Sequence, residues 1–181
     1  LQKLGRSEEA EFSCRQAIML KPDYAEAHNN LGIVLQKSGR SNEAEGSFRR
    51  AIALKPEYFQ AHNNLGIILQ ELGRLDEAEV SYTKALALKS DFAEAYNNLG
   101  IILKELGRLD EAEASYIKAL GLKHNYAEAH SNLGVTLQEL GRLDEALACF
   151  NQAIALKPDY AEAHYNLGNT LKELGRLDEA L

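Results

Sequence analysis

The sequence repeats itself at a fixed interval of 34 residues, and this period constrains the fold more than any other feature. The tripeptide Asn-Leu-Gly begins at residues 30, 64, 98, 132 and 166, and the dipeptide Gly-Arg begins at residues 5, 39, 73, 107, 141 and 175. Such a period is typical of a protein in which each unit packs on its neighbours. We therefore expect a single stack over residues 1–181, with complete repeats at 25–58, 59–92, 93–126 and 127–160 and partial repeats at 1–24 and 161–181.

Each repeat contains two amphipathic stripes, as the repeat 93–126 illustrates. Its apolar residues recur at intervals of three and four, which predicts a first helix carrying Ala95, Tyr96, Leu99, Leu103 and Leu106 and a second helix carrying Ala112, Tyr116, Ala119 and Leu120. Gly107 should end the first helix in a left-handed conformation, and the Gly-Arg at residue 5 predicts the same turn at the start of the chain. The hairpin then covers its apolar faces only by stacking on neighbouring hairpins.

Two details of the hairpin can also be predicted. Gly100 and Ala112 are small enough to let the two helices approach closely around the bulky Tyr116. Asp91 and Glu94 have the spacing of a capping box, in which the first residue caps the helix and the second reaches back to it. We therefore expect Asp91, and the residues equivalent to it in other repeats, to cap the first helices.

Composition excludes several classes of function. With 27 acidic against 20 basic residues, a formal charge of −7 and no basic run, the chain lacks the footprint of a nucleic-acid-binding protein. Its apolar stretches are too short to span a membrane. The two cysteines are too few for a disulfide framework or a zinc site, which favours a reducing compartment and hence a cytoplasmic location. Histidines that recur once per repeat lie about 10 Å apart in a stack, too far to share a metal ion.

No constellation of side chains suggests an enzyme. The Asp-Glu pairs stand at helix starts, where they complement the helix dipole, and no nucleophile lies beside a base. We expect no catalytic residue, no metal and no cofactor.

The repeat resembles the tetratricopeptide repeat. In the repeat 25–58 the resemblance is carried by His28, Leu31, Gly32, Leu35, Ala44, Phe48 and Pro56. The sequence departs from that family where histidine or Tyr96 replaces the usual tryptophan and where Ser90 and His124 replace proline. The resemblance implies an all-α, right-handed superhelical solenoid of antiparallel helix-turn-helix repeats, whose first helices line a concave groove and present an exposed stripe to a bound peptide.

A row of asparagines on this stripe is the candidate binding site. We call it the asparagine ladder, and its rungs are Asn30, Asn64, Asn98, Asn132 and Asn166. A side-chain amide offers one acceptor and two donors, so it can pair with both groups of a peptide backbone. The row is similar to the asparagine ladder in the repeat region of the O-linked N-acetylglucosamine transferases. The stripe also places Asn29, Asn63, Asn97, Ile67 and Ile101 among the candidate contact residues.

Both sets of residues have a structural alternative. In this alternative the asparagines bond to a neighbouring helix or are copies inherited from duplication, and the isoleucines belong to the core. Glutamates around the stripe make its rim acidic, which favours a neutral or basic ligand; they are Glu26, Glu71, Glu94, Glu105, Glu128, Glu139, Glu162 and Glu173.

Three functions remain open at this stage. The first is a scaffold that binds an extended peptide or partner segment on the ladder. The second is a substrate-recruiting arm of a larger enzyme, such as a glycosyltransferase. The third is a self-assembling element, because apolar end faces would allow copies to stack head to tail.

Overall fold

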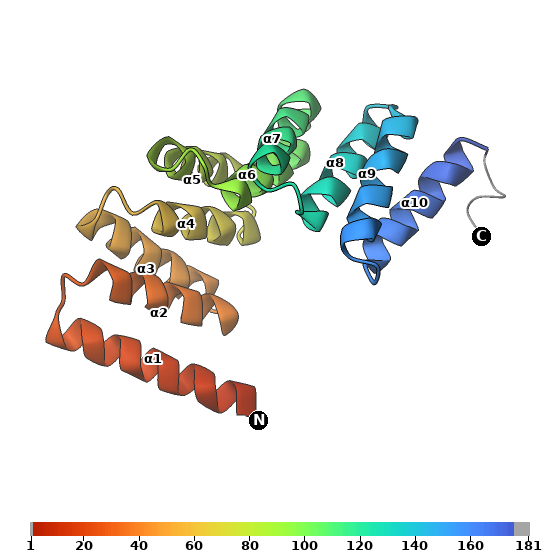
Figure 1. Cartoon of the computed structure of the whole chain (residues 1–181). Helices are drawn as coiled ribbons and strands as arrows, with labels where there is room; N and C mark the ends of the chain where they lie inside the picture. The colour runs from red at the N-terminus through yellow and green to blue at the C-terminus, as the bar shows by residue number, and fades with distance from the viewer. Residues whose placement is uncertain (1, 176–181) are drawn as a thin grey trace. The chain divides into compact units, whose positions relative to one another are not determined.

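The computed structural model describes residues 2–175, which form ten α-helices and contain no β-strand, so the all-α prediction is confirmed (Figure 1). The chain forms two compact units, Leu1–Ser90 (unit 1) and Asp91–Leu181 (unit 2). Unit 1 contains α1 (Gln2–Leu20), α2 (Ala25–Lys37), α3 (Ser41–Leu54), α4 (Phe59–Glu71) and α5 (Leu75–Leu88). Unit 2 contains α6 (Ala93–Glu105), α7 (Leu109–Leu122), α8 (Ala127–Glu139), α9 (Leu143–Leu156) and α10 (Ala161–Glu173).

The helices of each unit stack in chain order. In unit 1, α2 packs on α3 as one hairpin and also touches α4, the first helix of the next hairpin. In unit 2, α8 in the same way contacts its partner α9 and the first helices α6 and α10. This is the stacking expected of a helical solenoid, whereas its right-handed superhelical sense and its continuity over residues 1–181 stay predictions. None of the helices between residues 2 and 175 combines the length and apolarity that crossing a bilayer requires.

Glycine closes the turn within each hairpin as the sequence predicted. Gly107 has φ of 75°, a conformation that side chains resist, and its N–H donates to the carbonyl of Lys104 at 2.9 Å. The next N–H, that of Arg108, donates to the carbonyl of Leu103 at 2.8 Å. Together these two bonds make a Schellman motif that satisfies the last carbonyls of α6.

The turn predicted at Gly5 is not formed, because α1 continues through this residue. A glycine permits a turn but does not impose one. In the complete hairpins the turn is held by the packing of the two helices against each other.

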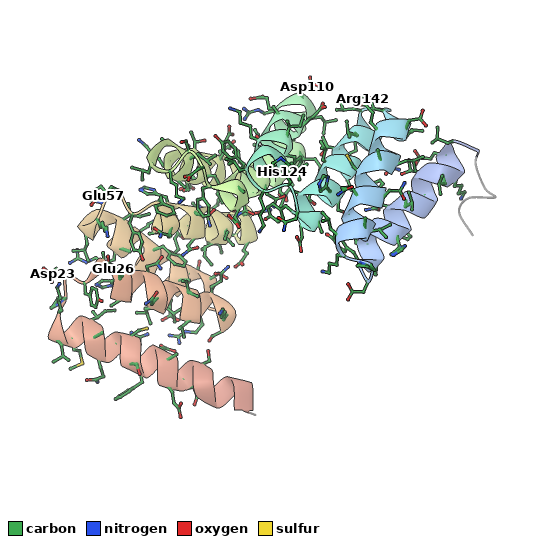
Figure 2. All side chains as sticks on the ribbon, viewed as in Figure 1. Asp23, Glu26, Glu57, Asp110, His124 and Arg142 are labelled. Carbon is green, nitrogen blue, oxygen red and sulfur yellow. The ribbon has the colours of Figure 1, made fainter. Side chains whose placement is uncertain are left out.

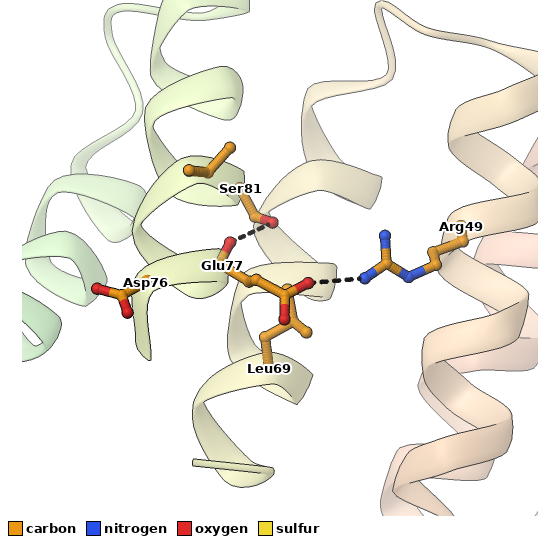
Figure 3. Close-up of a pocket in the computed structure, with 6 residues that line it drawn as sticks. Arg49, Leu69, Asp76, Glu77 and Ser81 are labelled. Carbon is orange, nitrogen blue, oxygen red and sulfur yellow. Dashed lines mark hydrogen bonds and ion pairs between the residues drawn. The ribbon is translucent and has the colours of Figure 1, made fainter. Parts of the chain in front are cut away.

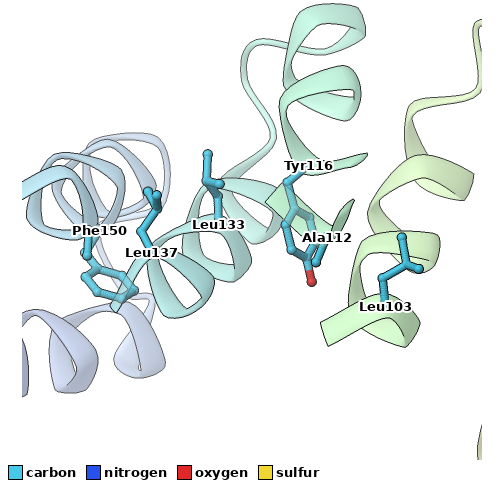
Figure 4. Close-up of a cluster of buried hydrophobic side chains, with 7 residues drawn as sticks. Leu103, Ala112, Tyr116, Leu133, Leu137 and Phe150 are labelled. Carbon is cyan, nitrogen blue, oxygen red and sulfur yellow. The ribbon is translucent and has the colours of Figure 1, made fainter. Parts of the chain in front are cut away.

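A close fit between glycine and an aromatic ring holds the two helices of each hairpin together. A Cβ built on Gly100 would lie 2.6 Å from the ring of Tyr116, and one built on Gly134 would lie 2.7 Å from the ring of Phe150. Both rings are fully buried, in a core cluster that includes Leu103 (Figure 4). The prediction that glycine makes room for the aromatic residue is therefore confirmed.

The predicted capping boxes are wrong. The N-cap of α6 is Phe92, one residue after Asp91, and Phe92 makes no side-chain cap hydrogen bond. The N-cap of α2, α4, α8 and α10 is a tyrosine. The aromatic ring packs under a lysine of the preceding loop instead, as Lys55 lies 5.1 Å from the ring centre of Tyr58. Equivalent lysine–tyrosine contacts lie at the N-caps of α2, α8 and α10.

Candidate functional site

The asparagine ladder lies on the first helix of every hairpin, with one rung on each of α2, α4, α6, α8 and α10. Asn30 is exposed, whereas Asn64, Asn98, Asn132 and Asn166 are partly exposed. Since α2 touches α4 in unit 1, and α8 touches both α6 and α10 in unit 2, the rungs of each unit stand on directly adjacent helices. Each unit therefore presents its own short row of side-chain amides.

The residues that precede the rungs are buried, although the sequence placed them on the exposed stripe. Asn29, Asn63 and Asn97 retain only 4%, 7% and 5% of their accessible surface, and Ser131 at the equivalent position retains 1%. This correction has a geometric cause, because adjacent residues lie about 100° apart around a helix and so cannot both face the groove. In this structure Asn29, Asn63 and Asn97 are not available for contact with a peptide.

Hydrogen bonds join the buried asparagines to the ladder. The side-chain Nδ2 of Asn64 donates to Oδ1 of Asn29 at 3.0 Å in unit 1. In unit 2, Nδ2 of Asn132 donates to Oδ1 of Asn97, also at 3.0 Å. Part of each rung's hydrogen-bonding capacity is therefore used within the protein, as the structural alternative supposed, while the partial exposure of both rungs leaves the rest accessible.

The isoleucines of the candidate site are both partly buried. Ile101 packs against the core cluster of unit 2, together with Val135 from the next repeat, so it serves the core whether or not it also touches a ligand. Ile67 has the same intermediate exposure in α4. Ile101 thus lies at the edge of the core of unit 2, as the structural alternative supposed.

The acidic rim is partly compensated by neighbouring side chains. Lys55 donates to Glu26 at 2.9 Å, and Lys123 donates to Glu94 at 3.3 Å, in both cases within one repeat. Other rim glutamates pair with a side chain of the preceding repeat. Glu71 accepts from Gln36, Glu139 pairs with Lys104, and Glu173 accepts from Gln138. The rim therefore carries less uncompensated negative charge than its composition alone suggests.

The recurring histidines fasten the loops between repeats. In each case Nε2 lies within hydrogen-bond distance of the backbone carbonyl oxygen six residues earlier: His28 with Pro22 at 3.0 Å, His62 with Pro56 at 2.8 Å, His130 with His124 at 3.1 Å and His164 with Pro158 at 3.0 Å. Because a carbonyl only accepts, Nε2 must carry the proton. Figure 2 labels one of these loop residues, His124. Each of these histidines thus has a backbone hydrogen-bond partner that the sequence analysis did not predict.

Metal binding and thiol reactivity would need side chains that the described part of the chain does not bring together. Among residues 7–175, no group of three or more histidine, cysteine or acidic side chains has the geometry to hold a metal ion. Burial raises the pKa of the Cys149 thiol to about 11, so this cysteine is protonated at neutral pH and packs beside the core cluster. Neither observation identifies a reactive centre.

The arginine that follows a turn glycine joins two consecutive repeats at Arg40, Arg74 and Arg142, a role that the sequence analysis missed. Nη1 of Arg74 donates to both carboxylate oxygens of Glu45, in the preceding second helix, at 2.9 and 2.8 Å. Its Nε and Nη2 donate to Glu77, in its own helix, at 2.7 Å each. The same pattern joins Arg40 to Glu11 and Glu43, and Arg142 to Glu113 and Glu145. Figure 2 labels Arg142. The recurrence of Gly-Arg with a Glu three residues after the Arg was the signal that could have revealed it.

In unit 1 this arrangement closes into a ring of four charges. Arg49 donates to Glu45 at 2.8 Å and to Glu77 at 3.2 Å, so both carboxylates bind Arg49 as well as Arg74. Unit 2 has the exposed Ile117 at the position of Arg49 and so lacks the fourth member. The ring is a structural link between α3 and α5.

The ring predicts a loss of stability in acid. Burial raises the pKa of Glu45, but hydrogen bonds from Arg49 and Arg74 outweigh it, so its pKa lies below the ordinary value of 4.5; the bond from Arg74 lowers the pKa of Glu77 as well. A lowered pKa stabilises the fold above the unfolded-state value, and that contribution is lost as the pH falls through the folded-state value. We expect the free energy of unfolding, measured by urea denaturation, to fall below about pH 4.5.

One variant tests whether the ring causes this loss of stability in acid. Arg74→Met keeps much of the side-chain volume but removes one of the two arginines that bind both carboxylates, so it should make the acid limb of the stability profile less steep. A wild-type profile and a variant profile with the same slope below about pH 4.5 would contradict the assignment.

The ring also explains a hollow on the surface of unit 1. This hollow of about 270 Å³ lies between α3 and α5 above Leu69 of α4. Figure 3 shows Arg49 reaching across it to Glu77, whose backbone carbonyl accepts a bond from Ser81 at 2.9 Å. Because an ion pair spans the opening and both signs of charge line it, the hollow is a bridged gap between two helices and not a specific ligand site.

Comparison with protein-family models matches most of the chain to one repeat family. Models described as tetratricopeptide repeat match residues 1–24, 25–58 and 57–122, and a model described as TPR repeat matches residues 137–175. No curated protein matches the sequence.

Solved structures share the fold at low sequence identity. YrrB, described as a TPR protein with an unusual peptide-binding site, is 26% identical with a TM-score of 0.76, over 93% of this chain and 87% of its own. MamA is 24% identical with a TM-score of 0.78, over 89% and 94% of the two chains. PilF of Pseudomonas aeruginosa is 22% identical with a TM-score of 0.88, over 99% and 82%.

Proposed function

We propose, since this chain belongs to the tetratricopeptide repeat family, that it is a protein-interaction scaffold whose asparagine ladder binds an extended peptide or partner segment. The observation that carries the proposal is the row of partly exposed amides, one on each first helix, within each unit. Stacked helices lie about 10 Å apart, which is about three residues of extended chain. Each rung therefore meets the backbone of every third ligand residue.

The chemistry of the rungs favours recognition of the backbone over recognition of side chains. An amide pairs with a peptide N–H or C=O whatever the neighbouring side chain is, so the ladder supplies affinity without strict sequence specificity. Specificity then comes from the rim, where Glu128 and Glu162 in unit 2 are exposed and disfavour an acidic ligand. We accordingly propose a neutral or basic segment as the ligand and a cytoplasmic setting for the interaction.

The likeness to YrrB supports this proposal over a catalytic role, because that protein is described by its peptide-binding site. A recruiting arm of a larger enzyme would use the same ladder for its substrate, so it is a special case of the scaffold. Head-to-tail association is a separate proposal, tested by light scattering over a range of protein concentrations; a constant monomer mass would refute it.

The ladder is best tested at the rungs that are not tied to a buried asparagine. Within residues 2–175 the side chains of Asn30 and Asn166 make no hydrogen bond to another side chain, so changing both to alanine should leave stability unchanged or raise it, by up to about 0.7 kcal/mol at each site. Affinity for short synthetic peptides selected on an array should fall about fivefold for each rung that binds, measured by calorimetry.

A rung with a buried partner provides the contrast. Asn132→Ala should weaken peptide binding and also lower the free energy of unfolding by about 1 kcal/mol, because it leaves the buried Oδ1 of Asn97 without its donor. If neither Asn132→Ala nor the double variant changes peptide affinity, the ladder is not the binding site. If the selected peptides are acidic, the proposed role of the rim is wrong.

A further inference from the structure

The rungs of the ladder differ in one respect that is independent of their exposure. Asn64 and Asn132 each donate Nδ2 to a buried asparagine of the preceding repeat, Asn29 and Asn97 respectively, at 3.0 Å. Asn166 follows a repeat in which Ser131 takes the place of that asparagine, and in the described chain its side chain makes no such bond. The same helix position thus exists in a tied form and an untied form.

We propose that the buried asparagine of one repeat is a positioning residue that fixes the orientation of the ladder amide in the next repeat, and so sets what that rung offers a ligand. The proposal concerns Asn29 acting on Asn64 in unit 1 and Asn97 acting on Asn132 in unit 2. Its significance for binding rests on the proposed function, whereas the orientation itself does not.

Hydrogen-bond accounting shows what a tied rung offers. An asparagine amide has two N–H donors and one carbonyl acceptor, and the buried partner occupies one donor. One donor and one acceptor remain, which are the groups complementary to one backbone C=O and one backbone N–H. A tied rung is therefore matched to a single peptide unit of an extended chain, and its O and N cannot exchange places by rotation without breaking the bond to Asn97.

The burial of the partner explains why the orientation is held. Asn97 is only 5% exposed and Asn29 only 4%, so water does not compete freely for the acceptor oxygen, and an unpaired Oδ1 there would be costly. If the pair served only the stability of the fold, its hydrogen bond would contribute most with both amides buried. Here the donor remains partly exposed, which leaves its other groups free to meet a ligand. Such preorganisation lowers the entropy lost when the ligand binds.

The chain also indicates how to untie a rung without unfolding it. Serine already occupies the equivalent buried position at residue 131, with 1% exposure, so Asn97→Ser and Asn29→Ser use a residue that this packing accepts. Exchange of the side-chain NH₂ protons with solvent, followed by NMR on ¹⁵N-labelled full chain without peptide, reports the orientation directly.

In the wild-type protein we expect the side-chain NH₂ of Asn132 to exchange about fivefold more slowly than that of Asn166, the factor for a hydrogen bond of ordinary net strength. Asn97→Ser should bring the NH₂ exchange rate of Asn132 to that of Asn166 and leave the rate of Asn64 unchanged. Asn29→Ser should bring the rate of Asn64 to that of Asn166 and leave the rate of Asn132 unchanged. Circular dichroism should show the same helix content in all three proteins. Unchanged exchange at Asn132 in Asn97→Ser would overturn the proposal, whatever the peptide data show.

The binding arm uses the array-selected peptide on the same variants. Asn97→Ser, which leaves Asn132 in place, should raise the dissociation constant about fivefold. An unchanged dissociation constant would overturn the claim that orientation sets what the rung offers. A wild-type protein that binds no array peptide would refute the proposed function instead, and the exchange rates would still decide whether Asn97 orients Asn132.

Discussion

Gly134→Ala is expected to lower the free energy of unfolding by about 2–3 kcal/mol, although alanine is the better helix former. The added Cβ would lie 2.7 Å from one carbon of the Phe150 ring and 2.9 Å from two others. That ring is fully buried and cannot swing aside, so α8 and α9 must separate. The loss should appear as a lower midpoint of urea denaturation, followed by circular dichroism.

The same change at Gly168 is the matched control. Gly168 has the corresponding position in α10, but a Cβ there would meet no described atom within 4 Å. Gly168→Ala should therefore be neutral or stabilise α10 by up to about 1 kcal/mol. If both variants lose the same stability, the contact with Phe150 is not what requires glycine. Combining Gly134→Ala with Phe150→Leu should also make the penalty smaller than in the wild-type background.

Phe150→Ala should have the largest effect of any single change considered, a loss of about 3–5 kcal/mol. The ring fills the space between α8 and α9 and belongs to the cluster that contains Leu137 and Tyr116, so its removal leaves a cavity that rigid helices cannot close. Thermal and urea denaturation should both show the loss.

Phe12→Ala controls for the substitution itself. Phe12 lies on α1 with 64% of its surface exposed, so truncation there should change stability by no more than about 0.5 kcal/mol. A loss at Phe150 no larger than the loss at Phe12 would contradict the assignment of the ring to the core.

The fold could be predicted from the sequence because the signals that determine it are local and repeated. The apolar spacing predicted the two helices of 93–126, and the structure places them at Ala93–Glu105 and Leu109–Leu122. Gly107 was correctly placed in the turn, because few residue types other than glycine adopt the positive φ that this turn requires. The capping box was wrong because the helix begins one residue later than the spacing of Asp91 and Glu94 implied, with the aromatic Phe92 as its N-cap.

The candidate site was only partly predictable, because it depends on contacts between repeats. The sequence identified the ladder, but it treated Asn97 and Asn98 as neighbours on one surface, when a step of one residue turns a side chain toward the interior. It also missed the role of Arg74, whose partner Glu45 lies 29 residues earlier. A pairing of that kind becomes visible only when one repeat is laid against the next.

The distances along the sequence between these partners have a further consequence. The arginine after the turn glycine lies 29 residues from its glutamate partner in the preceding repeat, and the asparagine partners are 35 residues apart, wherever these pairs recur within a unit. Each interaction thus reaches the adjacent hairpin and no further. A gene segment encoding one whole period can be duplicated or deleted, and each surviving side chain then faces the equivalent position of a neighbouring repeat at the same spacing. Lengthening by duplication is therefore open to this architecture without new packing solutions.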